Sequence, residues 1–246
     1  MRGPPTVALT GVFGTPRRHL REVDSTNRLA RELAAAGARH GALVSADAQF
    51  AGRGRQGRAW IAPPGNALIG SWVVREPRRL LSLAAGVAVA ELCGPEAMVK
   101  WPNDVLLGGL KVAGILVQGR PQEGWAVLGI GINVAVEVSE LPAELRDRAG
   151  TLGLSAGQRE PLLARLNERL ARWLAAPDAE LLEALSARDT LRGRPVRWQL
   201  GGGDLAAHAD QSGSGVAAGL DQAGRLLIRQ AQGGMVALDA GEVHLI

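Results

Sequence analysis

Two lysines stand apart in a chain whose other basic residues are all arginines. The sequence has 246 residues with 28 lysines and arginines, and only Lys100 and Lys111, which lie within twelve residues of each other, are lysines. A lysine ammonium is a compact point charge that can lose its proton, whereas the arginine guanidinium is a planar fork that stays charged. The two lysines therefore indicate a site that needs a compact cation.

The segment Gly52–Trp60 is the second candidate for chemistry. Its glycines have the Gly-x-Gly-x-x-Gly spacing of dinucleotide-binding loops, which also require a helix after the loop and an acidic residue about twenty positions further on. Here Pro63-Pro64-Gly65 follows, which does not open a helix, and no Asp or Glu occurs between Asp47 and Glu76. A dinucleotide site is therefore rejected.

The same segment, named the glycine–arginine loop below, suits an anion. Glycines let the backbone fold closely around a ligand. The side chains of Arg53, Arg55 and Arg58 offer planar donors for phosphate or carboxylate oxygens. We expect this loop to be mobile when empty and to order around an anion. A flexible solvated loop and an RNA-binding Arg-Gly segment remain the alternatives.

Side-chain amides, hydroxyls and a carboxylate mark other turns. Asn103 and Asp104 form a turn after the strand that carries Lys100, and Asn133 ends a glycine-rich strand. Ser25-Thr26-Asn27 is most simply a helix N-cap, although such a helix start can also hold a small polar ligand. Taken alone, each group is explained more simply by a cap, a turn or a hairpin edge.

Several other kinds of site are missing from the sequence. It contains no Gly-x4-Gly-Lys-Ser/Thr loop, so a Walker site for ATP is excluded. The four histidines lack the spacing of a zinc site, and no Gly-x-Ser-x-Gly nucleophile elbow occurs. The single cysteine, Cys93, lies in an apolar helical segment and is expected to be part of the core.

The composition is that of a globular chain, with 46% hydrophobic and 21% charged residues. No apolar run approaches the roughly 18 residues of a transmembrane helix, and no cleavable secretion signal opens the chain. One cysteine fits a reducing compartment, so we predict a cytoplasmic protein without membrane contact. The net charge of +4 is mild and unclustered, which favours solvated arginines over a nucleic-acid-binding tail.

The hydrophobic pattern predicts an α+β main domain over residues 1–188. Its first twenty residues read as a strand or an irregular arm, and a helix follows the N-cap and stops at Gly37. The other predicted helices cover 80–93, 160–174 and 178–187. The predicted strands cover 42–46, 67–74, 98–101, 105–107, 112–118 and 125–134, with a Gly-Gly hairpin delivering Lys111.

Residues 189–246 have a different texture. Short alternating segments, separated by glycine-containing turns, predict strands at 195–200, 204–209, 215–220, 226–230, 235–238 and 243–246. So many short strands in under sixty residues predict a small all-β barrel. We therefore expect a second domain that begins at residue 189.

Five segments together resemble the biotin protein ligases, in that family's order and spacing. They are Ser25-Thr26-Asn27, Gln49-x-x-Gly52-Arg53-Gly54-Arg55-x-Gly57-Arg58-x-Trp60, Lys100-Trp101-Pro102-Asn103-Asp104, Lys111-x-x-Gly114-Ile115 and Gly129-Ile130-Gly131-Ile132-Asn133. The resemblance runs from about residue 20 to the end. It implies a mixed sheet with flanking helices, similar to class II synthetases, and a C-terminal SH3-like barrel.

The resemblance implies a reaction in two halves, with biotin and MgATP as substrates. The biotin carboxylate attacks the α-phosphorus, giving biotinyl-5′-AMP and pyrophosphate, and a lysine of a biotin carboxyl carrier protein then takes the biotinyl group. The carrier subunit of acetyl-CoA carboxylase is the usual acceptor in this family. Only about twenty residues precede Ser25, too few for the family's DNA-binding module, so we expect a monofunctional form without nucleic-acid binding.

The resemblance also assigns roles to residues, with Lys111 and Arg53 as the catalytic pair. Asp104 is a weak candidate for holding Mg²⁺, and the metal ligands otherwise stay unassigned. The implied biotin-binding residues are Ser25, Thr26, Asn27, Gln49, Arg53, Gly54, Arg55, Lys111, Gly114 and Ile115. The implied ATP- and adenylate-binding residues are Arg55, Arg58, Trp60, Asn103, Lys111 and Asn133.

Two rival functions stay open at this point. A lipoate or octanoate protein ligase or transferase shares the fold and a comparable lysine, but a different arginine–glycine segment is expected there. A single-stranded nucleic-acid module would use the glycine–arginine loop with Trp60 as a stacking platform, and it leaves Lys100–Asp104 unexplained. A homodimer through edge strands and a monomer are both compatible with the composition.

Overall fold

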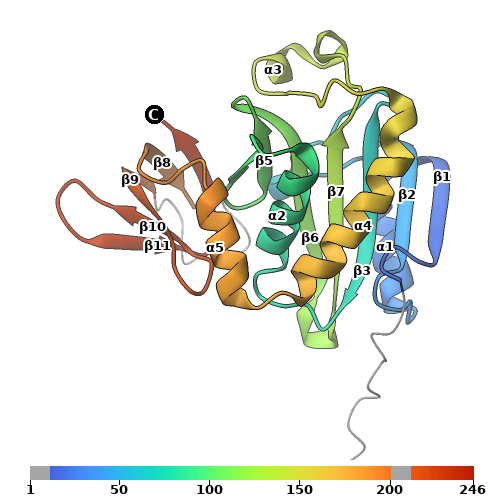
Figure 1. Cartoon of the computed structure of the whole chain (residues 1–246), viewed down its shortest axis with the longest axis horizontal. Helices are drawn as coiled ribbons and strands as arrows, with labels where there is room; N and C mark the ends of the chain where they lie inside the picture. Colours follow the sequence, from blue (N-terminus) through green and yellow to red (C-terminus); the bar gives the residue numbers. More distant parts are fainter. Residues whose placement is uncertain (1–11, 201–211) are drawn as a thin grey trace, which may run out of the picture.

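A seven-stranded mixed sheet lies at the centre of the computed structural model, which describes residues 12–200 and 212–246 (Figure 1). Its strand order is β1-β2-β3-β7-β6-β5-β4, with β1 parallel to β2 and every other pair antiparallel. The strands are β1 (Arg17–Val23), β2 (Leu43–Gln49), β3 (Ala67–Arg75), β4 (Met98–Lys100), β5 (Asp104–Leu107), β6 (Leu110–Arg120) and β7 (Trp125–Asn133). The predicted mixed sheet with flanking helices is confirmed.

The strands follow the predicted segments to within a few residues. β3 and β7 pair with each other over nine residues and are almost wholly buried, because both faces of the sheet are covered there. Strands buried on both faces read as continuous apolar runs rather than as alternating ones. The end of the segment predicted as a strand or an irregular arm forms the start of β1, an edge strand of the sheet that continues to Val23.

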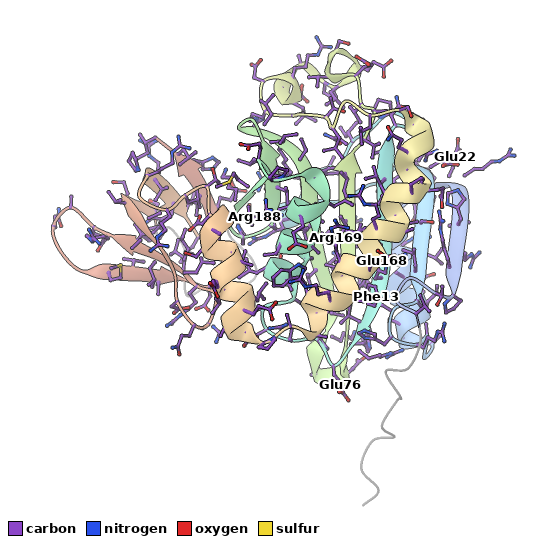
Figure 2. The ribbon with its side chains drawn as sticks, viewed as in Figure 1. Phe13, Glu22, Glu76, Glu168, Arg169 and Arg188 are labelled. Atoms are coloured by element: carbon purple, nitrogen blue, oxygen red, sulfur yellow. The ribbon has the colours of Figure 1, made fainter. Side chains whose placement is uncertain are left out.

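Three helices cover one face of the sheet: α2 (Leu81–Cys93), α4 (Arg159–Ala175) and α5 (Asp178–Arg188). α2 is apolar on all sides and is buried between the sheet and α4, as expected for such a helix. Arg188 Nη1 donates to the carbonyls of Ala97 at 2.7 Å and Gly94 at 3.1 Å, joining the end of α5 to the start of β4 (Figure 2). All three helices match their predicted spans.

The opposite face carries α1 (Thr26–Ala35), which packs on β2, β3 and β7 through Ala30 and Ala34. Ser25 occupies the N-cap position and Gly37 follows the helix with φ +90°, as the sequence predicted. The Ser25 side chain makes no capping hydrogen bond. Short helical turns complete the main part: α3 (Ala143–Arg146) and the 3-10 turns Arg55–Gly57, Pro121–Glu123, Val138–Glu140 and Ala156–Gln158.

A second, five-stranded antiparallel sheet follows α5. It has the order β11-β10-β9-β8-β12, from β8 (Pro195–Gln199), β9 (Ser212–Leu220), β10 (Leu226–Arg229), β11 (Met235–Leu238) and β12 (Glu242–Leu245). The predicted strand at 204–209 lies outside the described residues. Trp101 Nε1 donates to the Gly224 carbonyl at 3.1 Å, and apolar side chains of both sheets share one buried cluster. The division at residue 188 therefore stays a prediction.

None of the described helices has the length and apolar character that a membrane crossing requires.

Candidate active site

A cavity of about 570 Å³ lies on the face of the seven-stranded sheet that carries α1. Every residue that the sequence singled out for chemistry or ligand binding contributes to its lining. These residues are Ser25, Thr26, Asn27, Gln49, Arg53, Gly54, Arg55, Arg58, Trp60, Lys100, Asn103, Asp104, Lys111, Gly114, Ile115 and Asn133. Segments more than a hundred residues apart thus meet in one place, although the role of each residue stays a prediction.

Glycines form the floor of the cavity. Gly114 on β6 pairs with Gly131 on β7, and Trp60 lies over both: a Cβ atom added at Gly131 would stand 2.4 Å from the Trp60 ring. A Cβ added at Gly129 would stand 2.1 Å from Asn27 Oδ1. Both distances are far below van der Waals contact, so any side chain at these positions would displace Asn27 or Trp60. The floor therefore joins two ends of the cavity, one at Asn27 and the other at Trp60.

The Asn27 end is polar and buried. The Thr26 N–H and hydroxyl donate to Gln49 Oε1 at 2.7 and 2.9 Å, and Asn27 Nδ2 donates to Gln118 Oε1 at 3.0 Å. The Ser71 hydroxyl donates to Asn27 Oδ1 at 2.6 Å. Buried hydroxyls and amides held in this way fix donors and acceptors for a small polar ring.

Ser71 was missed by the sequence reasoning. It is fully buried on β3, inside the apolar run Ala67–Val74. The signal was present, because Ser71 is the only polar side chain in the run Ala67–Val74, which is otherwise apolar or glycine. A buried hydroxyl needs a partner, and here its partners lie on α1 at the edge of the cavity.

The glycine–arginine loop crosses the cavity as a short hairpin. Trp60 N–H donates to the Gly52 carbonyl at 3.0 Å and Gly54 N–H donates to the Arg58 carbonyl at 2.6 Å. A Cβ added at Gly52 would meet the Trp60 carbonyl oxygen at 2.5 Å, so the close approach of the two strands requires glycine there. At the tip, Gln56 has φ +53°, in the left-handed region.

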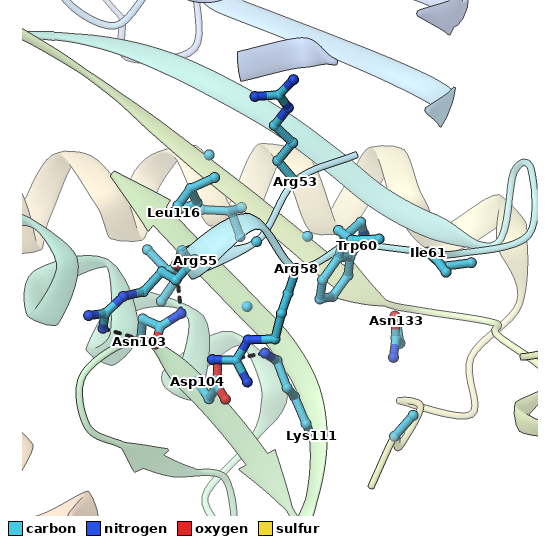
Figure 3. Close-up of a pocket in the computed structure, with 18 of the residues that line it drawn as sticks. Arg53, Arg55, Arg58, Trp60, Ile61, Asn103, Asp104, Lys111, Leu116 and Asn133 are labelled. Atoms are coloured by element: carbon cyan, nitrogen blue, oxygen red, sulfur yellow. Dashed lines mark hydrogen bonds and ion pairs between the residues drawn. The ribbon is translucent and has the colours of Figure 1, made fainter. Parts of the chain in front are cut away.

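The loop's arginines point in different directions. In Figure 3, Arg58 extends toward the side of the cavity that holds Asp104 and Lys111, whereas Arg53 points away from it. Arg58 Nη2 lies 2.5 Å from Glu242 Oε1 of the C-terminal sheet. Arg55 Nη1 donates to Asn103 Oδ1 at 3.5 Å, and burial lowers the pKa of Arg55 below its usual value. The loop thus presents Arg55 and Arg58, but not Arg53, to the Lys111 side.

Lys111 stands where the sequence placed it, directly after a tight hairpin. Gly108 and Gly109 have φ +58° and +84°, as this turn requires, and β6 begins at Leu110. Lys111 Nζ lies 2.7 Å from Asp104 Oδ1 and 6.0 Å from the centre of the Trp60 ring. The ammonium is therefore held between a carboxylate and an aromatic face, on the same side of the sheet as the glycine floor.

Two buried polar atoms at the Trp60 end have no hydrogen-bond partner within the described part of the chain: Trp60 Nε1 and Asn133 Oδ1. The other end of the Asn133 amide is engaged, because Nδ2 donates to the Gly150 carbonyl at 2.8 Å. Unsatisfied buried polar atoms are rare in folded proteins, and their presence beside a cavity marks groups that a ligand would satisfy.

Two further walls of the cavity were not foreseen. Residues 141–149 follow β7, and Lys111 N–H donates to the Arg148 carbonyl at 2.8 Å, so this segment is tied to the strand that carries the lysine. His244 and Leu245 of β12 also line the cavity. Both walls depend on long-range packing, and neither segment has a periodic pattern or motif that would have revealed it.

Comparisons with known proteins agree with this geometry. Residues 20–135 match the family model described as the biotin/lipoate A/B protein ligase family. The biotin–[acetyl-CoA-carboxylase] ligase of Paracoccus denitrificans is 36% identical over 250 residues, which cover 91% of this chain and 98% of that protein. This chain belongs to the biotin protein ligase family.

The structural comparison extends the family relationship to both sheets. The biotin protein ligase from Aquifex aeolicus in complex with biotin and ATP superposes with a TM-score of 0.77 and 29% identity, covering 94% of this chain and 99% of that one. The bifunctional ligase/repressor BirA of Bacillus subtilis is 40% identical over 149 residues. The chain covers 46% of that protein, about half its length.

Proposed function

We propose that this chain is an ATP-dependent ligase that converts biotin to biotinyl-5′-AMP and transfers it to a lysine of a carrier protein. One observation carries this proposal: a buried polar end at Asn27 and a cationic end at Lys111 are joined by a glycine floor within one cavity. A carboxylic acid with a polar ring and an apolar chain would span these ends. Relatives named for biotin, and a neighbouring structure with biotin and ATP, support the choice of substrates.

In the first half-reaction an oxygen of the biotin carboxylate bonds to the α-phosphorus of ATP. The bond from that phosphorus to the bridging oxygen of the β-phosphate breaks, and pyrophosphate leaves with the electron pair. Two anions must approach, so cations that bind the developing charge supply most of the catalysis. Lys111 is placed for this, because its ammonium stands over the glycine floor beside Trp60.

The proposed biotin-binding set occupies the Asn27 end and the floor. Thr26, Asn27 and Gln49 would hold the ureido ring, and the strand with Gly114 and Ile115 would line the channel for the apolar chain. The proposed adenylate set occupies the other end. Trp60 Nε1 and Asn133 Oδ1 would gain partners there, while Arg55, Arg58 and Asn103 would surround the phosphates.

A reactive acyl-adenylate must be kept from water until the acceptor arrives. The glycine–arginine loop already crosses the cavity and would cover the intermediate. In the second half-reaction the acceptor amine attacks the acyl carbon, an amide bond forms, the bond from that carbon to the AMP oxygen breaks, and the amine loses a proton. We propose the biotin carboxyl carrier protein of acetyl-CoA carboxylase as the acceptor.

Asp104 fits a role in holding Mg²⁺ with ATP. Mg²⁺ is commonly bound by one or two carboxylates together with substrate phosphates, and Asp104 is a single carboxylate with the Asn103 amide beside it on the cavity wall. Among the described residues no cluster of three or more His, Cys, Asp or Glu side chains offers a metal site without a substrate. When bound, the ion neutralises phosphate charge, and the positioning of ATP is left to Lys111, Arg55 and Arg58.

We infer that residues 189–246 form an SH3-like barrel domain and that the protein acts in the cytoplasm. The antiparallel sheet of β8 to β12 supports the barrel. A homodimer through edge strands of the main sheet stays a prediction that sedimentation of the purified protein would test. Nucleic-acid binding is not expected, and titration with single-stranded DNA at low and high salt would test it.

The decisive experiment is exchange of labelled pyrophosphate into ATP, with biotin, lipoate or octanoate supplied in parallel. Exchange with biotin alone is the expected result, because only the adenylating half-reaction is needed for it. Exchange with lipoate or octanoate would retain the fold and overturn the substrate. A folded protein that exchanges with none of the three acids would overturn the proposed ligase activity.

A further inference from the structure

Lys100, the second of the two lysines, has no role in the proposed mechanism so far. It ends β4 and pairs in register with Asp104 on β5, while Lys111 lies on β6. Lys100 lines the main cavity and also a smaller hollow of about 40 Å³ that adjoins it. That hollow lies between the tip of the glycine–arginine loop, the turn 101–104 and β12. Asp104 on β5 therefore lies between the strand that carries Lys100 and the strand that carries Lys111.

The charges around this hollow do not balance. Asp104 is paired with Lys111 at 2.7 Å, and Glu242 is paired with Arg58 at 2.5 Å. Within residues 12–200 and 212–246, no carboxylate lies within ion-pair distance of Lys100 or Arg55. Two cations without carboxylate partners thus face a partly buried hollow. Such an excess attracts an anion, and burial strengthens the attraction relative to open solvent.

The order of the strands indicates which anion would lie in this hollow and how it would extend from Lys111. β6, β5 and β4 are neighbours in that order, so Lys111 and Lys100 are separated by two strand spacings, about 10 Å at the backbone. If the α-phosphate lies at Lys111, the rest of the triphosphate chain extends past Asp104 toward Lys100. Burial lowers the pKa of Lys100, whose charge is also affected by Asp104, Lys111, Arg58 and Glu242. A phosphate anion beside Lys100 would offset that cost of burial.

We propose that Lys100 is a catalytic residue of the first half-reaction, and that its ammonium binds the pyrophosphate that leaves from ATP. This inference rests on the proposed ligase function. As the bond between the α-phosphorus and the bridging oxygen breaks, negative charge grows on that oxygen and on the β- and γ-phosphates. Lys100 and Arg55 stabilise this charge, while Lys111 acts on the α-phosphate and the carboxylate. The carbon–oxygen bond cleavage of the second half-reaction involves no pyrophosphate.

Because Lys100 is assigned to the first half-reaction alone, each half-reaction can be measured separately as a test. Lys100→Met should lower biotin-dependent exchange of pyrophosphate into ATP by about 10²-fold, the size expected for loss of one group that stabilises developing charge. The same variant should transfer biotin from supplied biotinyl-5′-AMP to a carrier domain at the wild-type rate. Inhibition by added pyrophosphate should weaken in Lys100→Met and recover in Lys100→Arg. Arg18→Met removes an exposed cation on β1 and should change none of these rates.

The outcomes separate this inference from the proposed function. Equal losses in exchange and in transfer would show that Lys100 is structural, and an unchanged exchange rate would show that it does not bind pyrophosphate. Either result overturns the assignment of Lys100. A wild-type protein that catalyses neither half-reaction would instead overturn the ligase function. If Lys100→Met does not melt cooperatively, Lys100→Gln takes its place. Weaker inhibition of Lys100→Gln by pyrophosphate would support the assignment of Lys100, and unchanged inhibition would overturn it.

Discussion

Arg58 of the glycine–arginine loop and Glu242 of β12 form an ion pair of 2.5 Å that joins the loop to the C-terminal sheet. Glu242→Gln should remove this pair. Arg58 is exposed, and exposed pairs contribute at most about 1 kcal/mol, so the melting temperature should barely change while the KM for ATP rises up to about five-fold. Steady-state kinetics at varied ATP would measure this, and an unchanged KM would show that the pair does not orient Arg58.

Two glycines on one strand should separate the two substrates. A methyl group at Gly129 would collide with Asn27 Oδ1, and one at Gly131 would collide with the Trp60 ring. Gly129→Ala should raise the KM for biotin and Gly131→Ala the KM for ATP, each by about ten-fold or more, as overpacking of this size costs about 1–3 kcal/mol. The variants are controls for each other. Equal effects of both variants on both substrates would show that the floor does not divide the cavity.

Lys111→Ala should abolish detectable adenylate formation, with a loss on the order of 10²–10³-fold or more. The change also leaves the Asp104 carboxylate without its 2.7 Å partner, which adds an anion beside the incoming phosphates. Single-turnover formation of biotinyl-5′-AMP would measure the loss. Asp104→Asn combined with Lys111→Ala removes the added anion. Because Asp104 is also proposed to hold Mg²⁺, Asp104→Asn alone is the control, and activity of the double variant above the product of the two single effects reports the repulsion.

Arg53→Ala and Arg55→Ala should release biotinyl-5′-AMP into solution, since the loop is proposed to cover the intermediate. The structure leads us to expect a larger effect for Arg55, because Arg55 contacts Asn103 whereas Arg53 points away from Lys111. Labelled biotinyl-5′-AMP recovered after rapid filtration would measure retention. Tight retention in both variants would overturn the assignment of a covering role to this loop.

Cys93 should resist modification in the folded protein. Burial raises its pKa from 9.0 to about 12, so its thiolate is scarce at neutral pH and alkylation should require unfolding. The unfolded thiol ionises first, so Cys93 contributes stability below pH 9 that is lost as the pH rises toward 12. The slope cannot exceed about 1.4 kcal/mol per pH unit. Urea unfolding of the wild type and Cys93→Ala across this range would show a shallower pH dependence in the variant.

The sequence predicted the elements that depend on local pattern. α2 is apolar apart from Ser82 and Glu91, and β3 and β7 are largely continuous hydrophobic runs, so their type and extent could be read directly. The hairpin that presents Lys111 followed from Gly108-Gly109. The motif residues could be predicted to meet because the family resemblance covers them, although their separation in the chain gives no sign of contact.

Other parts of the site could not be predicted from the sequence, because they depend on contacts between distant segments. His244 and Leu245 of β12 reach the cavity because the second sheet packs against the first, where Trp101 donates to Gly224, a contact between residues 123 positions apart. The wall at 141–149 is held to Lys111 by backbone hydrogen bonds. Such bonds do not depend on the side chains, so the residue types do not reveal them. Ser71 was readable as a hydroxyl in an apolar strand, but its partners on α1 were not.

The hairpin bonds within the glycine–arginine loop have a consequence for how the site closes. Gly52 and Trp60 are already paired by a backbone hydrogen bond, as are Gly54 and Arg58. A loop whose two strands are already hydrogen-bonded to each other loses less conformational entropy on binding a ligand than an unpaired chain of equal length. We therefore expect the loop to move as one piece about its base, and the amide protons of Gly54 and Trp60 to be protected from solvent exchange before any ligand binds.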